Sequence, residues 1–226
     1  MAERRTEAVL FDIDGTLIST GGASDRAWKR AFKELQQVDV DVPAVTGKGV
    51  PDPEVGRQCF RAVLDREPSA EEMESLMRRR LDHLPEEVES SPGYVVKDGA
   101  VELLERLIDD GILLGLTTGN VEEAAHIKLS RGGLNGYFSF GGYGSDSPDR
   151  VQLTKKALER AEVVSGRTLD LARCFSCGDT PRDVEAGHGA GIRVVGVATG
   201  EYTVEELREA GADATVSSLR EGLPLL

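Results

Sequence analysis

The sequence has few of the residues that mark thiol-based redox proteins and zinc proteins. It holds three cysteines and three histidines in 226 residues, and aromatic residues make up only 5%. Cys174 and Cys177 form a C-x-x-C pair, but they lie in an apolar run that reads as a strand, where residues three apart face opposite sides. We therefore expect buried thiols there rather than a redox or metal pair, and the scattered histidines show no ligand spacing.

Positive charge is also scarce. There are 27 lysines and arginines against 40 aspartates and glutamates, a net charge of −13, which works against the binding of polyanions such as nucleic acid. The apolar stretch from Ala8 to Phe11 is too short for a signal-peptide core or a membrane span. These features predict a cytoplasmic protein with neither nucleic acid nor membrane as a partner. We expect a monomer or a homodimer.

What the chain does contain is a series of short apolar runs that favour buried strands. Most are apolar at consecutive positions, which is typical of strands covered by helices on both faces. From residue 93 onward they alternate with amphipathic helical patterns, and this alternation predicts a doubly wound α/β fold with a parallel sheet. The expected strands are residues 8–13, 112–117, 137–140, 174–177, 192–198 and 214–216.

Residues 19–91 interrupt that alternation with three or four helical patterns and no buried strand. Ser69 and Glu72 form a capping box, and Ser24 can cap an earlier helix. We expect an all-helical cap at 19–91, inserted over the end of the first strand into a core of residues 1–18 and 92–226. The three arginines from Arg78 to Arg80 read as the solvated face of a cap helix.

Two acidic motifs follow apolar strands. In FDIDGTL, Asp12 and Asp14 are two residues apart and so face the same side, at the strand end where open α/β sheets bind ligands. In CGDTPRDVEAG, Asp179 stands at another strand end, and Asp183 suits either helix capping or a site. Carboxylates gathered at strand ends repel one another, and a hard cation that prefers oxygen, such as Mg²⁺, answers that problem.

A third run, LGLTTGN, ends a buried strand at Thr118, Gly119 and Asn120. The hydroxyl of Thr118 and the backbone N–H groups that follow could bind a phosphate oxygen near a helix N-terminus. Asn120 with Glu123 is equally an ordinary helix start. Both interpretations stay open on this run alone.

Together, DxDGT, a threonine at the next strand end and GDxxxD resemble the haloacid dehalogenase superfamily of phosphohydrolases, and the helical insertion is similar to caps of the phosphoglycolate-phosphatase and phosphoglucomutase type. The resemblance implies a Rossmann-like core and Mg²⁺-dependent hydrolysis of a small phosphorylated metabolite through an aspartyl-phosphate. Asp12 would be the nucleophile and Asp14 the acid and base. Mg²⁺ would be held by Asp12, the Asp14 backbone carbonyl and Asp179, with support from Asp183. Substrate contacts would come from Gly15, Thr16, Thr118, Gly119 and Asn120, with Thr118 binding the transferring phosphoryl group.

The chain departs from the family where a lysine is usual ahead of GDxxxD. Arg150 is our candidate replacement, because it keeps the charge and offers a planar fork to phosphate; Lys155 and Lys156 are the alternatives. For substrate recognition we single out Lys48, in the loop TGKGVPDPEVGR that also carries Asp52 and Arg57. A phosphosugar mutase and a non-catalytic phospho-ligand-binding protein are the alternative functions, whereas Asp14 disfavours a dehalogenase.

Overall fold

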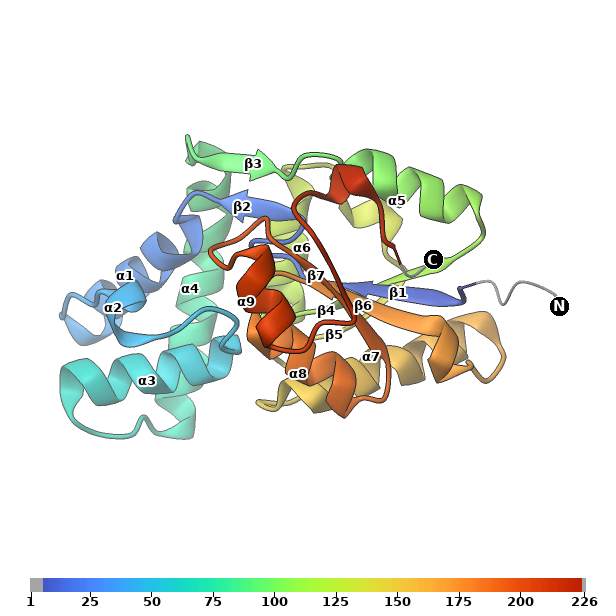
Figure 1. The fold of residues 1–226 in the computed structure, drawn as a ribbon. Coiled ribbons are helices and arrows are strands. Elements are labelled where there is room, and N and C mark those ends of the chain that lie inside the picture. Colours follow the sequence, from blue (N-terminus) through green and yellow to red (C-terminus); the bar gives the residue numbers. More distant parts are fainter. Residues whose placement is uncertain (1–5, 225–226) are drawn as a thin grey trace, which may run out of the picture.

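A six-stranded parallel sheet forms the centre of the computed structural model, which describes residues 6–224 (Figure 1). The strand order is β5-β4-β1-β6-β7-β8. This confirms the predicted doubly wound α/β fold. The strands are β1 (Ala8–Phe11), β4 (Leu113–Thr117), β5 (Phe140–Gly142), β6 (Cys174–Gly178), β7 (Arg193–Val197) and β8 (Ala214–Val216).

Helices cover both faces of this sheet, because the side chains of each strand alternate between the faces. Val9 and Phe11 of β1 belong to the core under α5 and α6, whereas Ala8 and Leu10 belong to the core under α7. The thiols of Cys174 and Cys177 are likewise buried on opposite faces, as predicted. The helices are α5 (Ala100–Asp109), α6 (Glu122–Ser130), α7 (Arg150–Ser165), α8 (Pro181–Gly189) and α9 (Val204–Glu209), with short 3₁₀ turns η1 (Asn135–Tyr137), η2 (Leu171–Arg173) and η3 (Leu219–Glu221).

The helical insertion consists of four helices that gather at one end of the molecule (Figure 1). It has its own apolar core around Trp28, Phe32 and Phe60. The capping box of Ser69 is present as predicted, but Ser24 does not cap; the first helix begins after Gly22, whose φ of 79° is left-handed. The helices are α1 (Ala23–Gln36), α2 (Val42–Val45), α3 (Asp52–Leu64) and α4 (Ala70–Ser90).

A two-stranded antiparallel ribbon, β2 (Ile18–Thr20) with β3 (Tyr94–Val96), joins the two ends of the insertion. The sequence did not predict it, because each strand has only three residues and its partner lies more than 70 positions away. The predicted strand at 137–140 was also wrong in position. Residues 135–137 form η1, and the strand β5 that follows contains Gly141 and Gly142, which give no apolar signal.

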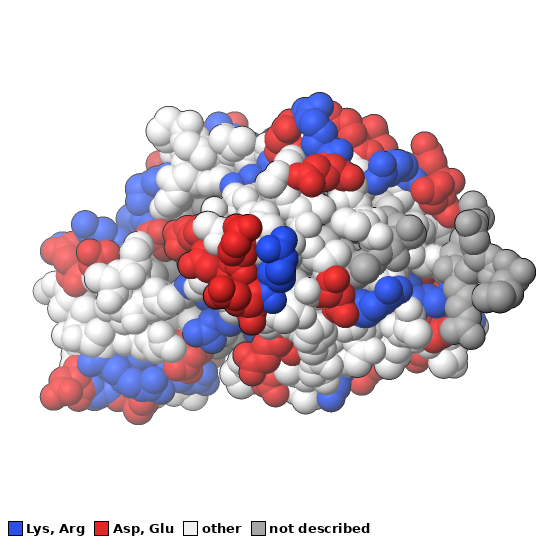
Figure 2. All heavy atoms as spheres, in the orientation of Figure 1, with Lys and Arg blue, Asp and Glu red and all other residues white. Residues whose placement is uncertain are grey.

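The visible surface carries charges of both signs. Figure 2 shows acidic side chains gathered over α9, with lysines and arginines scattered among other acidic groups on this face. Within residues 6–224, no helix is both long and apolar enough to span a bilayer.

Candidate active site

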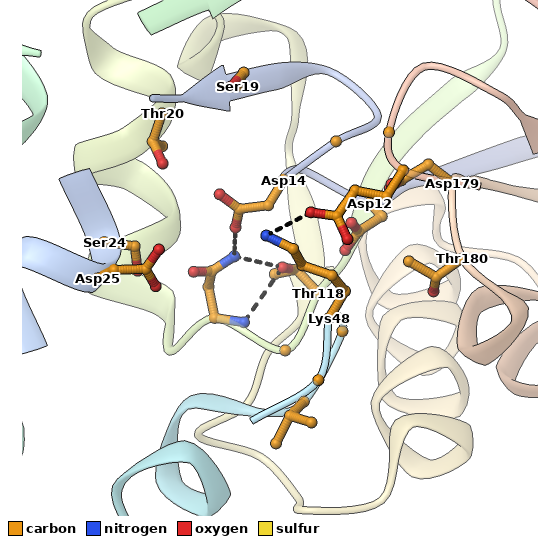
Figure 3. A pocket seen from close by; sticks show the side chains of 18 of the residues that line it. Asp12, Asp14, Ser19, Thr20, Ser24, Asp25, Lys48, Thr118, Asp179 and Thr180 are labelled. Carbon is orange, nitrogen blue, oxygen red and sulfur yellow. Dashed lines mark hydrogen bonds and ion pairs between the residues drawn. The ribbon is translucent and has the colours of Figure 1, made fainter. Parts of the chain in front are cut away.

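The carboxyl ends of β1, β4 and β6 lie level with one another. Phe11 of β1 pairs with Leu116 of β4 on one side and with Cys177 of β6 on the other. Asp12, which follows Phe11, therefore sits beside the residues that leave β4 and β6. A cavity of about 670 Å³ opens there between the sheet and the helical insertion (Figure 3).

Three carboxylates converge at this point. Asp12, Asp179 and Asp183 are all at least nine-tenths buried, and each offers an oxygen within 4.8 Å of the others. Burial, and next the charge of Asp183, raises the pKa of Asp12 well above its usual value and that of Asp179 to about 7. The protein alone thus disfavours full ionisation of the cluster, and a hard divalent cation bound by these oxygens would relieve that cost.

The turn after Asp14 is shaped around Asp179. Gly15 has a φ of +93°, and a Cβ atom there would lie 2.2 Å from Asp179 Oδ2, so only glycine fits. The next residue, Thr16, is fully buried and donates its hydroxyl to Asp179 Oδ1 at 2.9 Å. Thr16 therefore positions a carboxylate of the cluster, and its side chain does not face the cavity as a substrate contact would.

Asp183 makes two kinds of contact at once. As its spacing from Thr180 indicates, it belongs to a capping box at the start of α8, where its Oδ2 accepts from the Thr180 backbone N–H at 3.0 Å. Its other oxygen, Oδ1, accepts from Arg150. Because only Oδ2 caps the helix, Oδ1 can face Arg150 and the acidic cluster.

Arg150 supplies positive charge to the cluster. Its buried guanidinium donates from Nη2 to Asp183 and to Asp12 Oδ1 at 3.4 Å, and from Nη1 to the Gly49 carbonyl at 3.0 Å. Arg150 therefore contacts the acidic cluster directly, and its role as the replacement for the usual lysine stays a prediction. Lys155 and Lys156 lie on the exposed face of α7 and do not line the cavity.

Asp14 belongs to a separate network, which includes a residue that sequence reasoning missed. Lys128 of α6 is buried and donates from Nζ to Asp14 Oδ2 at 2.7 Å and to Asn120 Oδ1 at 2.6 Å. Burial by itself would raise the pKa of Asp14, but the charge of Lys128 and hydrogen bonds from Lys128 and Asn120 outweigh it and lower the pKa. One sequence signal could have indicated Lys128: it is a charged residue on the same buried face of the helix as Ala124, Ala125 and Leu129.

Thr118 faces the same cavity (Figure 3), and Asn120 also lines it. The Thr118 hydroxyl oxygen accepts from Asn120 Nδ2 at 2.8 Å, and Asn120 Nδ2 also donates to Asp14 at 2.7 Å. The hydroxyl proton of Thr118 is left to point toward a ligand. Asn120 is not a helix cap, since α6 begins after Val121.

The predicted recognition loop is only partly at the cavity. Lys48 lines it (Figure 3) and pairs at 3.1 Å with Glu201, which also lines the cavity. Gly119 lines it as well. Arg57 does not; it pairs with Glu54 at 3.9 Å on the surface of α3.

The fold and site describe an α/β protein with an acidic centre at its strand ends. The family model described as haloacid dehalogenase-like hydrolase matches residues 9–197, and the chain belongs to this family.

Curated relatives cover nearly the whole chain. The chain is 30% identical over 238 residues to N-acetylmuramic acid 6-phosphate phosphatase of Pseudomonas aeruginosa, covering all of this chain and 97% of the relative. It is 26% identical to phosphoglycolate phosphatase of Nitrosospira multiformis, covering 97% and 95%. The solved structure of CbbY from Rhodobacter sphaeroides has the same fold, with a TM-score of 0.76, 20% identity and 96% of each chain covered.

Proposed function

We propose that this protein is a Mg²⁺-dependent phosphatase that removes phosphate from a small metabolite by way of a phosphorylated Asp12. The observation that carries the proposal is the convergence of Asp12 with Asp179 and Asp183 at one end of a cavity that also contains Asp14. The phosphatase names of the curated relatives support the same reaction class.

The residues divide the reaction into two steps. Asp12 attacks phosphorus and the bond to the leaving oxygen breaks, while Asp14 gives that oxygen a proton. Water then attacks the aspartyl-phosphate, Asp14 takes the proton, and phosphate leaves with the Asp12 carboxylate restored. The Thr118 hydroxyl donates a hydrogen bond to a phosphoryl oxygen, and Arg150 places its positive charge beside Asp12, where negative charge develops. One acid/base residue serves both steps because Asp14 is left as a carboxylate once it has protonated the leaving oxygen, and it is protonated again by the attacking water.

The donor set fits Mg²⁺. Asp12, Asp179 and Asp183 present hard oxygens at one point, and burial together with the charge of Asp183 raises the pKa of Asp12 and of Asp179, an effect that a bound cation would oppose. We propose that Asp12, Asp179 and the Asp14 carbonyl hold the ion with support from Asp183. When bound, Mg²⁺ would neutralise charge on the carboxylates and on the phosphate.

Removal of Mg²⁺ is expected to abolish turnover of p-nitrophenyl phosphate, and returning Mg²⁺ should restore it. Because ligands bind a cation in their ionised form and Asp179 has a pKa of about 7 without metal, Mg²⁺ affinity should fall as the pH drops below about 7. Titration calorimetry with Mg²⁺ at several pH values measures this. Full turnover in excess chelator would contradict the proposal.

The two alternative functions are separated by product analysis. A mutase would convert a sugar phosphate into its isomer, whereas the proposed phosphatase releases inorganic phosphate. A non-catalytic binding protein would bind phosphate without turning over any ester. The presence of Arg150 at the cluster counts against the last alternative, since the charge that the family lysine supplies is retained.

The cavity walls favour a hydroxylated leaving group over a carboxylate. All four cations that line the described cavity already donate to protein oxygens: Lys48 to Glu201, Lys97 to the Thr199 carbonyl, Lys128 to Asp14 and Arg150 to Asp183. In contrast, Asp25 of α1 lines the cavity and forms no hydrogen bond or ion pair within residues 6–224, and burial raises its pKa. A substrate hydroxyl or amino group would satisfy Asp25, and a substrate carboxylate would be repelled by it.

We therefore expect sugar or polyol phosphates to be better substrates than 2-phosphoglycolate. Asp25→Asn should lower kcat/KM for the best sugar phosphate by roughly tenfold or more, since a hydrogen bond to a charged group is lost. Turnover of p-nitrophenyl phosphate should change little. Asp41→Asn, an exposed position of the same insertion, is the matched control. Equal losses for all substrates would contradict this assignment of Asp25.

A further inference from the structure

One of the three consecutive arginines in α4 is completely buried, contrary to the sequence expectation. The side chains of Arg78 and Arg79 are 70% and 44% exposed, whereas that of Arg80 is 0% exposed. The guanidinium of Arg80 stacks over Trp28, with its central carbon 4.6 Å from the ring centroid. A buried cation is costly unless it is paired, so the contacts of Arg80 indicate why it is there.

The partner of Arg80 is Asp52, at the first residue of α3. Arg80 Nη1 donates to Asp52 Oδ2 at 2.8 Å, and Nη2 donates to Ser24 Oγ at 3.2 Å, while Nε has no partner among the described residues. Both partners belong to the helical insertion. Arg80 thus holds the Asp52 side chain in one orientation at the edge of the insertion that faces the sheet.

The same carboxylate reaches across to the core. Asp52 Oδ2 accepts from the backbone N–H of Val121 at 2.9 Å, and the Asp52 N–H donates to the Gly119 carbonyl at 2.8 Å. Val121 is the N-cap residue of α6 and provides no side-chain cap. Asp52 therefore satisfies the backbone N–H of the N-cap residue of α6. In a capping box the side chain at the third helical position accepts from that group, but here that position is Ala124, which has no acceptor.

The turn that Asp52 holds is the one that carries Thr118 and Asn120. It lies close against the insertion: a Cβ atom on Gly119 would be 3.0 Å from Pro51 Cα and 3.1 Å from the Val50 carbonyl oxygen. Asn120 in turn donates to Asp14. A shift of this turn would move the Thr118 hydroxyl and release a hydrogen bond to Asp14.

We propose that Arg80 is a positioning residue. Together with Asp52 it fixes residues 118–121, so that docking of the helical insertion on the core completes the phosphate site. The role in turnover rests on the proposed phosphatase function, but the contact from Asp52 to Val121 can be measured without any reaction. The rival explanation is that the Arg80–Asp52 pair merely stabilises the insertion.

Hydrogen exchange on the full chain tests the contact itself. In Arg80→Met and in the milder Asp52→Asn, exchange of the Val121 amide should accelerate by roughly tenfold or more, since a hydrogen bond to a charged group is weakened. Arg79→Met, one residue away on the same helix, should leave it unchanged. If Arg80→Met folds and both variants keep the wild-type exchange rate at Val121, the proposal is wrong.

Kinetics then separate positioning from stability. At temperatures well below the unfolding transition of each variant, kcat should fall roughly tenfold to a hundredfold, by a similar factor for sugar phosphates and for p-nitrophenyl phosphate, because the phosphate itself is misplaced. Arg80→Lys should recover part of the loss. A lower Tm with unchanged kcat and KM would establish the purely structural role instead. If neither the wild type nor any variant hydrolyses a phosphate ester, but exchange of the Val121 amide still accelerates in the variants, the proposed function is wrong and the positioning contact is supported.

Discussion

Asp12→Asn is expected to reduce kcat for phosphate release by roughly 10⁴- to 10⁶-fold, the loss usual when a covalent nucleophile is removed. The neutral amide keeps the shape of the side chain but cannot form the acyl-phosphate. Because the pKa of Asp12 is raised by burial and by its acidic neighbours, losing its charge should relieve repulsion, so the variant should unfold at a Tm equal to or above that of the wild type without metal.

The measurement is steady-state release of inorganic phosphate, accompanied by thermal unfolding of the same samples. Asp12→Ala is measured as a second variant, because the asparagine in Asp12→Asn can deamidate to aspartate and alanine cannot. Asp109→Asn, an exposed aspartate of α5, is the control for substitution in general. Retention of more than about a tenth of wild-type turnover in Asp12→Ala would mean that another group attacks phosphorus.

Asp14→Asn is expected to produce the second largest loss, roughly 10²- to 10⁴-fold, the usual contribution of a general acid or base. The loss should depend on the leaving group. A sugar alkoxide needs a proton to leave, so its expulsion should slow strongly, whereas p-nitrophenolate leaves without help. With p-nitrophenyl phosphate the variant should form the intermediate quickly and hydrolyse it slowly.

Rapid mixing of Asp14→Asn with p-nitrophenyl phosphate should therefore give a burst of one p-nitrophenolate per enzyme, followed by a slow steady rate. Lys128 and Asn120 lower the pKa of Asp14 against the effect of burial, so the carboxylate is favoured in the free enzyme. Asp14 must therefore take up a proton as the substrate binds before it acts as the acid, and after the first step it is again the carboxylate that activates water. Equal losses for both kinds of leaving group, with no burst, would remove Asp14 from the acid/base role.

The sequence predicted the acidic part of the site because its geometry is nearly local. Asp12 and Asp179 come directly after strands whose apolar runs are easy to recognise, and parallel strands deliver their carboxyl ends to one edge. The same reasoning left Asp183 open between helix capping and the site, and in the structure it both caps α8 and contacts Arg150.

The residues that were missed depend on tertiary contacts. Arg80 stands beside two arginines that are exposed, and nothing in the triplet shows which of them turns toward Asp52 and Trp28. Lys128 contacts Asp14 from α6, the helix that follows the run LGLTTGN. A charged residue in the buried stripe of a helix is the one sequence signal that applies to Lys128, and it names no partner.

The ribbon of β2 and β3 was missed for a related reason. Its six residues are far apart in the chain, and only one of the two strands, β2, lies near a motif. The expected division into residues 19–91 and the remainder stays a prediction, as do the cytoplasmic setting and the oligomeric state.

The most direct test of the central claim is to identify the phosphorylated residue. The enzyme is mixed with Mg²⁺ and a sugar phosphate that carries the radiolabel in its phosphate group, and the reaction is quenched in acid within one turnover. The protein is then digested, and the labelled peptide is identified. The account predicts label on the peptide that contains Asp12, as an acyl-phosphate that hydroxylamine cleaves. Rapid turnover with no label on the protein, or label on a different residue, would contradict it.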